Sequence, residues 1–196
     1  MKRWGVFLDR DGVINEEVNY LSSPDLLKLL PGAAQAIRQL NQQCIPVIVV
    51  SNQAGVARGY FAEREVQRIH AELSSLLLRG GAHVDRYYYC PHHPTECIGP
   101  YRMDCDCRKP KPGLLLKAES EMNLDLARSY LVGDNVTDIE AGIRAGVRSI
   151  LVLTGYGKSI LHSWHAPFQP HYVAQSLREA VSWIFRAAQN DALFGR

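Results

Sequence analysis

The stretch Gly5-Val6-Phe7-Leu8-Asp9-Arg10-Asp11-Gly12-Val13 indicates the fold, because an apolar run ends abruptly in two carboxylates. Residues 4–8 predict a buried strand bounded by Asp9. Two Asp separated by one residue at the end of a strand can point to the same side and converge on one cation. Hard oxygen ligands of this kind suit Mg²⁺. The stretch therefore predicts a strand that carries carboxylates to its carboxyl end.

Apolar runs alternate with segments of helical periodicity along the rest of the chain. Further strands are expected at 45–50, 84–89, 130–132 and 149–153, and helices at 33–40, 66–77, 114–122, 139–145 and 177–188. This alternation predicts an α/β protein with a parallel sheet and helices on both faces. Ligands of such sheets bind beyond the carboxyl ends of the strands. The polar side chains at those ends are therefore the site candidates: Asp9, Asp11, Ser51, Asn52, Cys90 and Asp134.

Length and composition limit the classes of protein to consider. The 196 residues predict one domain over 1–196, and 46% hydrophobic residues are enough for a buried core. A net charge of +2 argues against a protein that grips nucleic acid through its phosphates. The apolar run at 5–8 is too short for a signal peptide or a membrane span. We expect a monomer in the cytoplasm with no nucleic-acid or membrane partner.

Three further segments carry chemistry. Gly133-Asp134 with Asp138 repeats the pattern of an apolar strand followed by carboxylates. Turns and helix N-caps also favour Asp, but two such motifs, each after a strand, favour a metal site. The hydroxyl and N–H groups of 51–53 can hold phosphate oxygens, although for this segment alone a role as turn or cap residues is the favoured explanation. The cations of 108–111 can neutralise phosphate charge, or form a solvated basic turn.

The segment 90–107 predicts a second metal site. Cys90-Pro91-His92 and Cys105-Asp106-Cys107 enclose a gap of twelve residues, and three thiols with one imidazole match a tetrahedral Zn²⁺ site. The surrounding loop, 90–112, holds five Pro and little periodicity, so a metal would order it. Buried free thiols are the alternative, and His93 is an alternative ligand to His92. Cys44 and Cys97 are expected to be ordinary free thiols.

These segments together resemble the haloacid dehalogenase superfamily of phosphatases. The stretch 9–13 resembles its first motif, Ser51 its second and Lys109 its third, and Gly133-Asp134 with Asp138 resembles its acidic fourth motif. The resemblance implies a three-layer α/β/α Rossmann-like fold. It also implies Mg²⁺-dependent hydrolysis of phosphomonoesters through an aspartyl-phosphate. Because no large insert separates the motifs, no large cap domain is expected.

The resemblance assigns a role to each matched residue. Asp9 is the expected nucleophile and Asp11 the expected general acid and base. The carboxylates of Asp9 and Asp134 and the carbonyl of Asp11 are expected to hold Mg²⁺. The expected substrate-binding residues are Ser51, Asn52, Gln53, Arg108 and Lys109. Lys111 remains a rival for the role of Lys109, and Asp138 contacts the metal or serves its helix.

The thiol-rich loop narrows the resemblance to a zinc-containing branch of the superfamily. This branch contains D-glycero-D-manno-heptose 1,7-bisphosphate 7-phosphatases and histidinol-phosphatases, and the long gap between 92 and 105 resembles the former. It implies a small phosphorylated sugar as substrate, cleaved at its 7-phosphate, with Arg108 at the far phosphate and Arg58 as an alternative. Loops 15–24, 53–60 and 90–107 would wall the site. Histidinol phosphate is the alternative substrate, and a zinc-ordered nucleic-acid-binding module is the alternative class.

Overall fold

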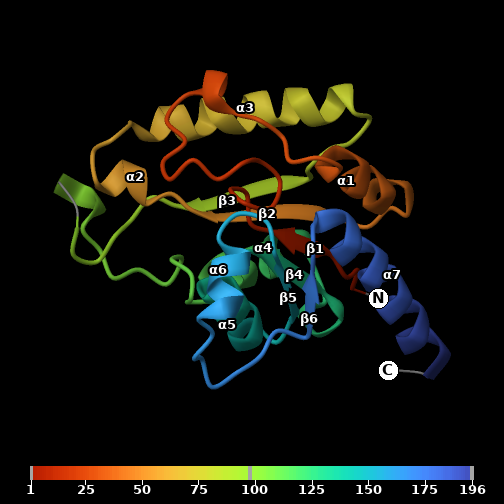
Figure 1. Ribbon diagram of the computed structural model, residues 1–196. Helices are drawn as coiled ribbons and strands as arrows, with labels where there is room; N and C mark the ends of the chain where they lie inside the picture. Colours follow the sequence, from red (N-terminus) through yellow and green to blue (C-terminus); the bar gives the residue numbers. More distant parts are fainter. Residues whose placement is uncertain (1, 97–98, 195–196) are drawn as a thin grey trace.

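A computed structural model describes residues 2–96 and 99–194 and arranges six strands in one sheet (Figure 1). Each neighbouring pair is parallel, and the order is β3-β2-β1-β4-β5-β6. The strands are β1 (Val6–Leu8), β2 (Val47–Asn52), β3 (Arg86–Cys90), β4 (Tyr130–Gly133), β5 (Arg148–Val152) and β6 (Tyr172–Ala174). The parallel sheet predicted from the alternation is confirmed.

Helices connect the strands and cover the sheet. They are α1 (Ala33–Gln42), α2 (Ala54–Ala57), α3 (Glu63–Arg79), α4 (Gly113–Met122), α5 (Val136–Ala145), α6 (Gly157–His162) and α7 (Leu177–Phe194). Short 3₁₀ turns occupy Pro24–Leu26, Gly99–Tyr101 and Leu126–Arg128. None of the helices in the described ranges has the length and apolar character needed to cross a membrane.

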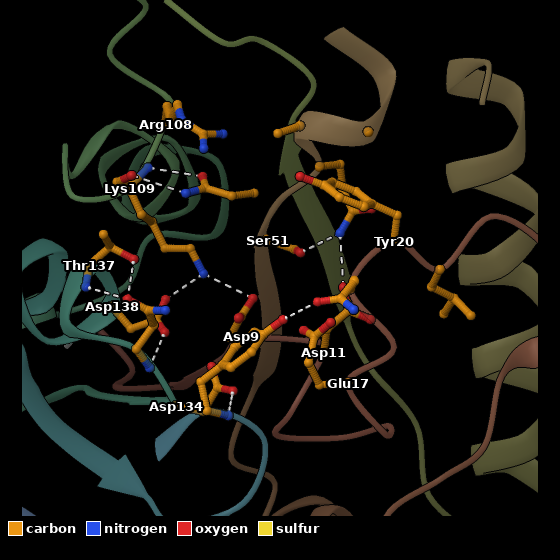
Figure 2. A pocket seen from close by; sticks show the side chains of 18 of the residues that line it. Asp9, Asp11, Glu17, Tyr20, Ser51, Arg108, Lys109, Asp134, Thr137 and Asp138 are labelled. Atoms are coloured by element: carbon orange, nitrogen blue, oxygen red, sulfur yellow. Dashed lines mark hydrogen bonds and ion pairs between the residues drawn. The ribbon is translucent and has the colours of Figure 1, made fainter. Parts of the chain in front are cut away.

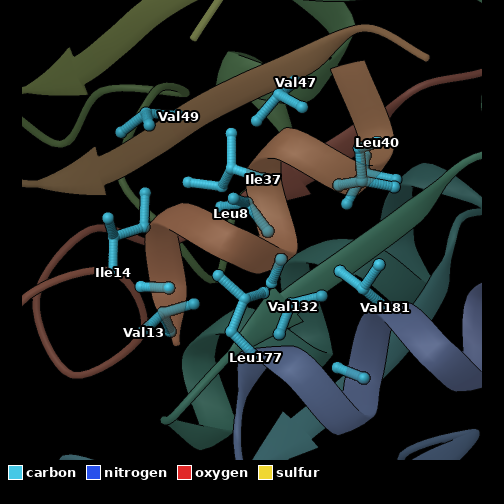
Figure 3. Close-up of a cluster of buried hydrophobic side chains, with 14 of the residues drawn as sticks. Leu8, Val13, Ile14, Ile37, Leu40, Val47, Val49, Val132, Leu177 and Val181 are labelled. Atoms are coloured by element: carbon cyan, nitrogen blue, oxygen red, sulfur yellow. The ribbon is translucent and has the colours of Figure 1, made fainter. Parts of the chain in front are cut away.

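One face of the sheet packs against α1, α3 and α7. Successive side chains of a strand point to opposite faces, so Val6 and Leu8 enter this core while Phe7 does not. Figure 3 shows Ile37 and Leu40 of α1 and Val181 of α7 within this cluster. The apolar spacing that predicts a helix at 33–40 is therefore the buried face of α1.

The opposite face packs against α4 and α5. Phe7 lies there with Leu131 of β4, facing Leu115 of α4 and Ala141 of α5, and all four are completely buried. Two apolar cores on the two faces of one sheet make three layers. The predicted three-layer α/β/α fold is thus confirmed.

The strand order creates the position for a site. β1 lies between β2 and β4, and the chain leaves it toward β2 first and reaches β4 later. Doubly wound sheets bind ligands at the point where the strand order reverses, outside the carboxyl ends of the strands. Leu8 pairs with Val132 across β1 and β4, so Asp9 and the Gly133-Asp134 turn emerge side by side.

Several boundaries differ from the expected ones. β2 runs to Asn52 instead of ending at residue 50, because Ser51 and Asn52 pair with Tyr89 and Cys90 of β3. β6 and α6 lie in a region for which the sequence pattern predicts no element. The last helix extends to 194 instead of 188. Cys44 is a free, exposed thiol as expected, whereas Cys97 lies outside the described residues.

Candidate active site

A cavity of about 510 Å³ lies at the carboxyl ends of β1, β2 and β4 (Figure 2). It gathers the sequence-predicted residues from loops that are distant in the chain. Its lining includes Asp9, Asp11, Ser51, Asn52, Gln53, Arg108, Lys109, Asp134 and Asp138. The side chains predicted to form one site therefore share one cavity.

Lys109 lies at the centre of the charged network. Its side chain is 2% exposed, and its Nζ lies 2.9 Å from Oδ1 of Asp9 and 2.6 Å from Oδ1 of Asp138. The same ammonium donates to the carbonyl of Val50 at 2.7 Å. Burial lowers the pKa of Lys109, but the carboxylates of Asp138 and Asp9 outweigh burial and raise it. Lys109 is therefore a fixed cation.

The backbone of Lys109 is anchored by Asn52. The Asn52 amide donates to the Lys109 carbonyl at 3.0 Å and accepts from the Lys109 N–H at 3.0 Å. Lys111 lies outside the cavity, where its Nζ pairs with Asp104 at 2.7 Å. The geometry thus distinguishes the two lysines and brings Lys109 to the predicted site.

We expect Lys109→Met to lower the free energy of unfolding by about 3–5 kcal/mol, because it leaves buried carboxylates without their cation. Denaturant unfolding without added divalent ions measures this loss. Lys111→Met is the matched control. It removes an ion pair in which Lys111 is one-third exposed and Asp104 is largely exposed, so the change should stay within about 0.5 kcal/mol. Equal losses in the two variants would contradict the central position of Lys109.

Asp134 is held by a backbone N–H and two glycines. The Tyr156 N–H donates to its Oδ2 at 2.8 Å. A Cβ on Gly12 or Gly155 would come within 2.1 or 2.0 Å of the same oxygen, and both glycines have positive φ. Only glycine allows the backbone to approach the carboxylate so closely. Burial, reinforced by Asp9 and Asp138, raises the pKa of Asp134 to about 8.

Asp9, Asp134 and Asp138 each offer one carboxylate oxygen to a cluster in which these three atoms lie within 4.8 Å of one another. Burial raises the pKa of Asp9 to about 6 even though Lys109 opposes the shift. Three clustered carboxylates, two of them buried, leave an excess of negative charge beside one ammonium. A hard divalent cation fits this oxygen donor set and would offset that charge.

The acidic trio includes the side chain of Asp138, whereas the sequence favours Asp9, Asp11 and Asp134. Asp138 also has two other contacts. One oxygen pairs with Lys109, and the other accepts from the N–H of Asn135 at 3.1 Å in the capping box of α5. Both readings of Asp138, metal contact and helix cap, therefore have a geometric basis.

Asp11 points to a different set of partners. Arg10 donates to its two oxygens from Nε at 3.1 Å and from Nη2 at 2.6 Å. Asn15 donates at 2.8 Å and Gln53 at 3.2 Å. Burial raises the pKa of Asp11, but the Arg10 charge and these hydrogen bonds outweigh burial and hold it below its usual value. In this structure Asp11 is therefore a carboxylate.

Ser51, Gln53 and Arg108, the remaining predicted binding residues, also line the cavity. The hydroxyl of Ser51 accepts from Gln53 at 2.7 Å. Arg108 lines the cavity and donates to the carbonyl of His92 at 3.3 Å, so it joins the cavity to the thiol-rich loop. Arg58 instead pairs with Glu96 at 2.5 Å and lies over the ring of Tyr20, with its guanidinium carbon 5.5 Å from the centroid.

The four predicted thiol and imidazole ligands form a second cluster. Their ligand atoms lie within 4.8 Å of one another, and Cys105 Sγ lies 3.4 Å from Cys90 Sγ and 3.2 Å from Cys107 Sγ. His92 presents Nδ1 at 3.5 Å from Cys107. Three thiols and one imidazole fit a tetrahedral zinc ion. His93 turns away, because its Nδ1 accepts from the N–H groups of Thr95 and Glu96.

Sequence reasoning gave no individual role to several residues that line the cavity. Glu17 lines the cavity, and burial together with Asp11 raises its pKa to about 7. The Tyr156 hydroxyl donates to Asn19 at 2.7 Å and links two loops across the cavity. Glu17 and Asn19 lie in the segment 15–24, which is expected from the sequence to wall the site. Tyr156 lies in the stretch Thr154-Gly155-Tyr156-Gly157, which also resembles the heptose branch.

Comparison with known proteins identifies relatives that share one described activity. A family model described as HAD-hydrolase-like matches residues 106–180. The chain is similar to the D-glycero-D-manno-heptose-1,7-bisphosphate 7-phosphatase of Thermosynechococcus vestitus, with 42% identity over 94% of the chain and 96% of the relative. The D-glycero-beta-D-manno-heptose-1,7-bisphosphate 7-phosphatase of Pasteurella multocida is 40% identical over 91% of the chain and 95% of the relative.

A solved structure matches the whole architecture as well. It is the D,D-heptose 1,7-bisphosphate phosphatase of B. bronchiseptica in complex with magnesium and phosphate. The two structures superpose with a TM-score of 0.84 at 34% identity, covering 95% of this chain and 99% of that one. Sequence and architecture therefore indicate the same group of relatives.

Proposed function

Because the chain belongs to the haloacid dehalogenase superfamily of phosphatases, within the family of the D-glycero-D-manno-heptose 1,7-bisphosphate 7-phosphatases, we propose that it hydrolyses the 7-phosphate of this heptose bisphosphate. The observation that carries the proposal is the cavity in which Asp9, Lys109 and Asp134 meet. An anionic nucleophile, a fixed cation and an acidic cluster are the groups that phosphoryl transfer needs. The product of this reaction would be a precursor in the biosynthesis of nucleotide-activated heptose.

In the first step, an oxygen of Asp9 attacks phosphorus and the bond from phosphorus to the sugar oxygen breaks. The phosphoryl group is then held as an aspartyl-phosphate, and the electron pair stays on the sugar oxygen. A pKa of about 6 leaves Asp9 mostly ionised at neutral pH, and Lys109 at 2.9 Å offsets repulsion between its charge and the phosphate.

Asp11 is the proposed proton carrier. Its carboxylate suits the second step, in which it takes a proton from the water that attacks phosphorus. The bond between phosphorus and the Asp9 oxygen then breaks, which frees the Asp9 carboxylate and releases inorganic phosphate. In the first step it must instead donate a proton to the leaving sugar oxygen. The negative charge of an arriving phosphate favours protonation of Asp11 and offsets part of the effect of Arg10.

The phosphate-binding residues divide into direct and supporting ones. We assign the transferring oxygens to Ser51, Gln53 and Lys109, and the far phosphate to the planar fork of Arg108. Asn52 supports Lys109, because both ends of its amide are hydrogen-bonded to the Lys109 backbone.

We propose two metal sites, one for Mg²⁺ in the cavity and one for Zn²⁺ in the thiol-rich loop. The carboxylates of Asp9 and Asp134 and the carbonyl of Asp11 would hold Mg²⁺, with Asp138 beside them, and the bound ion supplies positive charge toward the phosphoryl oxygens. The relative of known structure binds magnesium and phosphate, which supports this assignment. A structural Zn²⁺ would occupy the cluster of Cys90, His92, Cys105 and Cys107.

We further propose that residues 1–196 form one phosphatase domain that acts as a monomer in the cytoplasm on a small phosphorylated sugar. Three thiols gathered for metal ligation, without disulfides among the described cysteines, are typical of a reducing compartment.

A phosphate-release panel tests the proposed reaction. The panel contains the heptose 1,7-bisphosphate, histidinol phosphate and common sugar monophosphates, each with Mg²⁺ and with a chelator. We expect kcat/KM for the bisphosphate to exceed that for histidinol phosphate by at least about 100-fold, because a second phosphate gives Arg108 its partner. We also expect the chelator to abolish turnover.

Two outcomes would overturn parts of the proposal. A preference for histidinol phosphate would replace the substrate but keep the reaction. Salt-dependent binding of oligonucleotides, with no phosphate release from any ester in Mg²⁺, would replace the enzyme by a nucleic-acid-binding module.

A further inference from the structure

Arg10 carries a charge into the protein interior. It stands between Asp9 and Asp11, yet its side chain is 0% exposed and it is not among the residues that line the cavity. Burying a guanidinium costs several kcal/mol unless its donors are satisfied. The Arg10 guanidinium therefore needs hydrogen-bond acceptors, and those acceptors identify the groups that it holds in place.

The partners of Arg10 connect Asp11 to the core. Two donors of the fork meet the two oxygens of Asp11, and Nη2 also donates to Gln53 Oε1 at 3.2 Å. On the inner side, Nη1 lies 3.5 Å from Nε2 of His70, which comes from α3. Arginine has only donors, so Nε2 of His70 is the acceptor.

His70 is itself fixed. Its ring is 7% exposed and stacks on Tyr87 of β3, with centroids 4.6 Å apart and an angle of 21° between the planes. The Tyr87 hydroxyl is hydrogen-bonded to Ser74 of α3 at 2.9 Å. Burial and the charge of Arg10 lower the pKa of His70 to about 3, so the ring is neutral and keeps its acceptor lone pair.

We propose that Arg10 and His70 are positioning residues that hold the Asp11 carboxyl in the orientation needed for proton transfer to the leaving group. This inference rests on the proposed function, because it assumes the proton-carrying role of Asp11. The contact between Nη1 of Arg10 and Nε2 of His70 fixes the guanidinium of Arg10. The guanidinium in turn fixes both carboxylate oxygens of Asp11. Neither Arg10 nor His70 is among the residues that line the cavity.

The leaving group distinguishes a positioning role from a merely structural one. A sugar alkoxide is a strong base and needs a proton as it departs, whereas p-nitrophenolate is a weak base and departs without one. A misplaced Asp11 therefore slows alkyl phosphates selectively. A general loss of folded protein would lower both activities in equal proportion. The quantity kcat/KM reports the step in which the leaving group departs.

The experiment compares the sugar phosphate and p-nitrophenyl phosphate in His70→Phe. This variant keeps a ring for stacking on Tyr87 and removes the acceptor for Arg10. We expect kcat/KM for the sugar phosphate to fall about tenfold, while that for p-nitrophenyl phosphate stays within about twofold. Tyr87→Phe, which removes the bond to Ser74 but no atom that contacts Arg10, should leave the ratio of the two unchanged.

Further variants keep the test decisive. His70→Gln offers a carbonyl acceptor and should restore the substrate ratio toward that of the unmodified chain. His70→Leu, which also lacks an acceptor for Arg10, replaces His70→Phe if the latter does not fold. Asp11→Asn calibrates the measurement, because it should show a larger selective loss on the sugar phosphate. No selectivity in Asp11→Asn would refute the proposed role of Asp11. Selectivity in Asp11→Asn without selectivity in the His70 variant that lacks an acceptor would refute the positioning role alone.

Discussion

Asp9→Asn is expected to lower phosphate release by about 10⁴-fold or more, because an amide does not attack phosphorus to form the covalent intermediate. The substitution keeps the shape of the side chain, so substrate can still enter the cavity. Single-turnover assays in Mg²⁺ with a phosphate-binding probe cover this range. Retention of the phosphoryl group on the protein after rapid quenching should disappear in the same variant.

The fold should survive this substitution. Asp9 is one of three neighbouring carboxylates, and Lys109 keeps Asp138 at 2.6 Å when the charge of Asp9 is removed. The free energy of unfolding should change by no more than about 1 kcal/mol, since lost repulsion offsets the lost ion pair. Asp25→Asn, an exposed Asp in the turn Pro24–Leu26, should change neither turnover nor stability. Near-normal turnover in Asp9→Asn would exclude a covalent aspartyl-phosphate.

The fold was predictable from sequence where an apolar run had no competing interpretation. Runs that end in Asp9 and in Gly133-Asp134 became adjacent strands of the sheet. β6 escaped prediction because it is three residues long and its first two residues are half-buried. α6 escaped because it is six residues long and has a single fully buried residue, Gly157. Short edge elements owe their form to packing against β5, which the local sequence does not encode.

Some features of the candidate site could be predicted from the sequence and others could not. Residues that follow strands could be predicted, because the carboxyl ends of parallel strands meet at one edge. The contacts of Arg10 could not, since Gln53 and His70 are 43 and 60 positions away in the chain. Charge alone would place Arg10 in solvent. Its burial is visible only after α3 is packed on the sheet.

The thiol-rich loop could be predicted from spacing alone, and its expected response to metal loss is large. Cys107→Ser removes one of the four clustered ligands, and ligation free energies of structural zinc are on the order of 10 kcal/mol. We expect zinc per chain, measured by mass spectrometry of the purified protein, to fall from about one to well below one. We also expect amide exchange across 91–107 to accelerate, because this loop lies between β3 and α4 and its described residues, 91–96 and 99–107, make few backbone hydrogen bonds with one another.

Disorder of the thiol-rich loop should also affect the active site, because Arg108 connects the two. Because Arg108 is tied to the carbonyl of His92, disorder of the loop frees the guanidinium from its place at the cavity. In Cys107→Ser, kcat/KM for the bisphosphate should fall by about tenfold or more, and Tm by about 10 °C if about 3–5 kcal/mol is lost. Turnover of p-nitrophenyl phosphate, which has no second phosphate, should fall less.

Cys44→Ser is the matched control, since Cys44 is a free and exposed thiol distant from the cluster in sequence. It should leave zinc content, amide exchange and kinetics unchanged. Full zinc content in Cys107→Ser would show that Cys107 is not a ligand. Absence of zinc from the unmodified protein would remove the metal from the loop while leaving the chemistry of Asp9 untouched, because the two clusters share no residue. The nucleophile and the zinc loop can therefore be tested independently, each with its own readout.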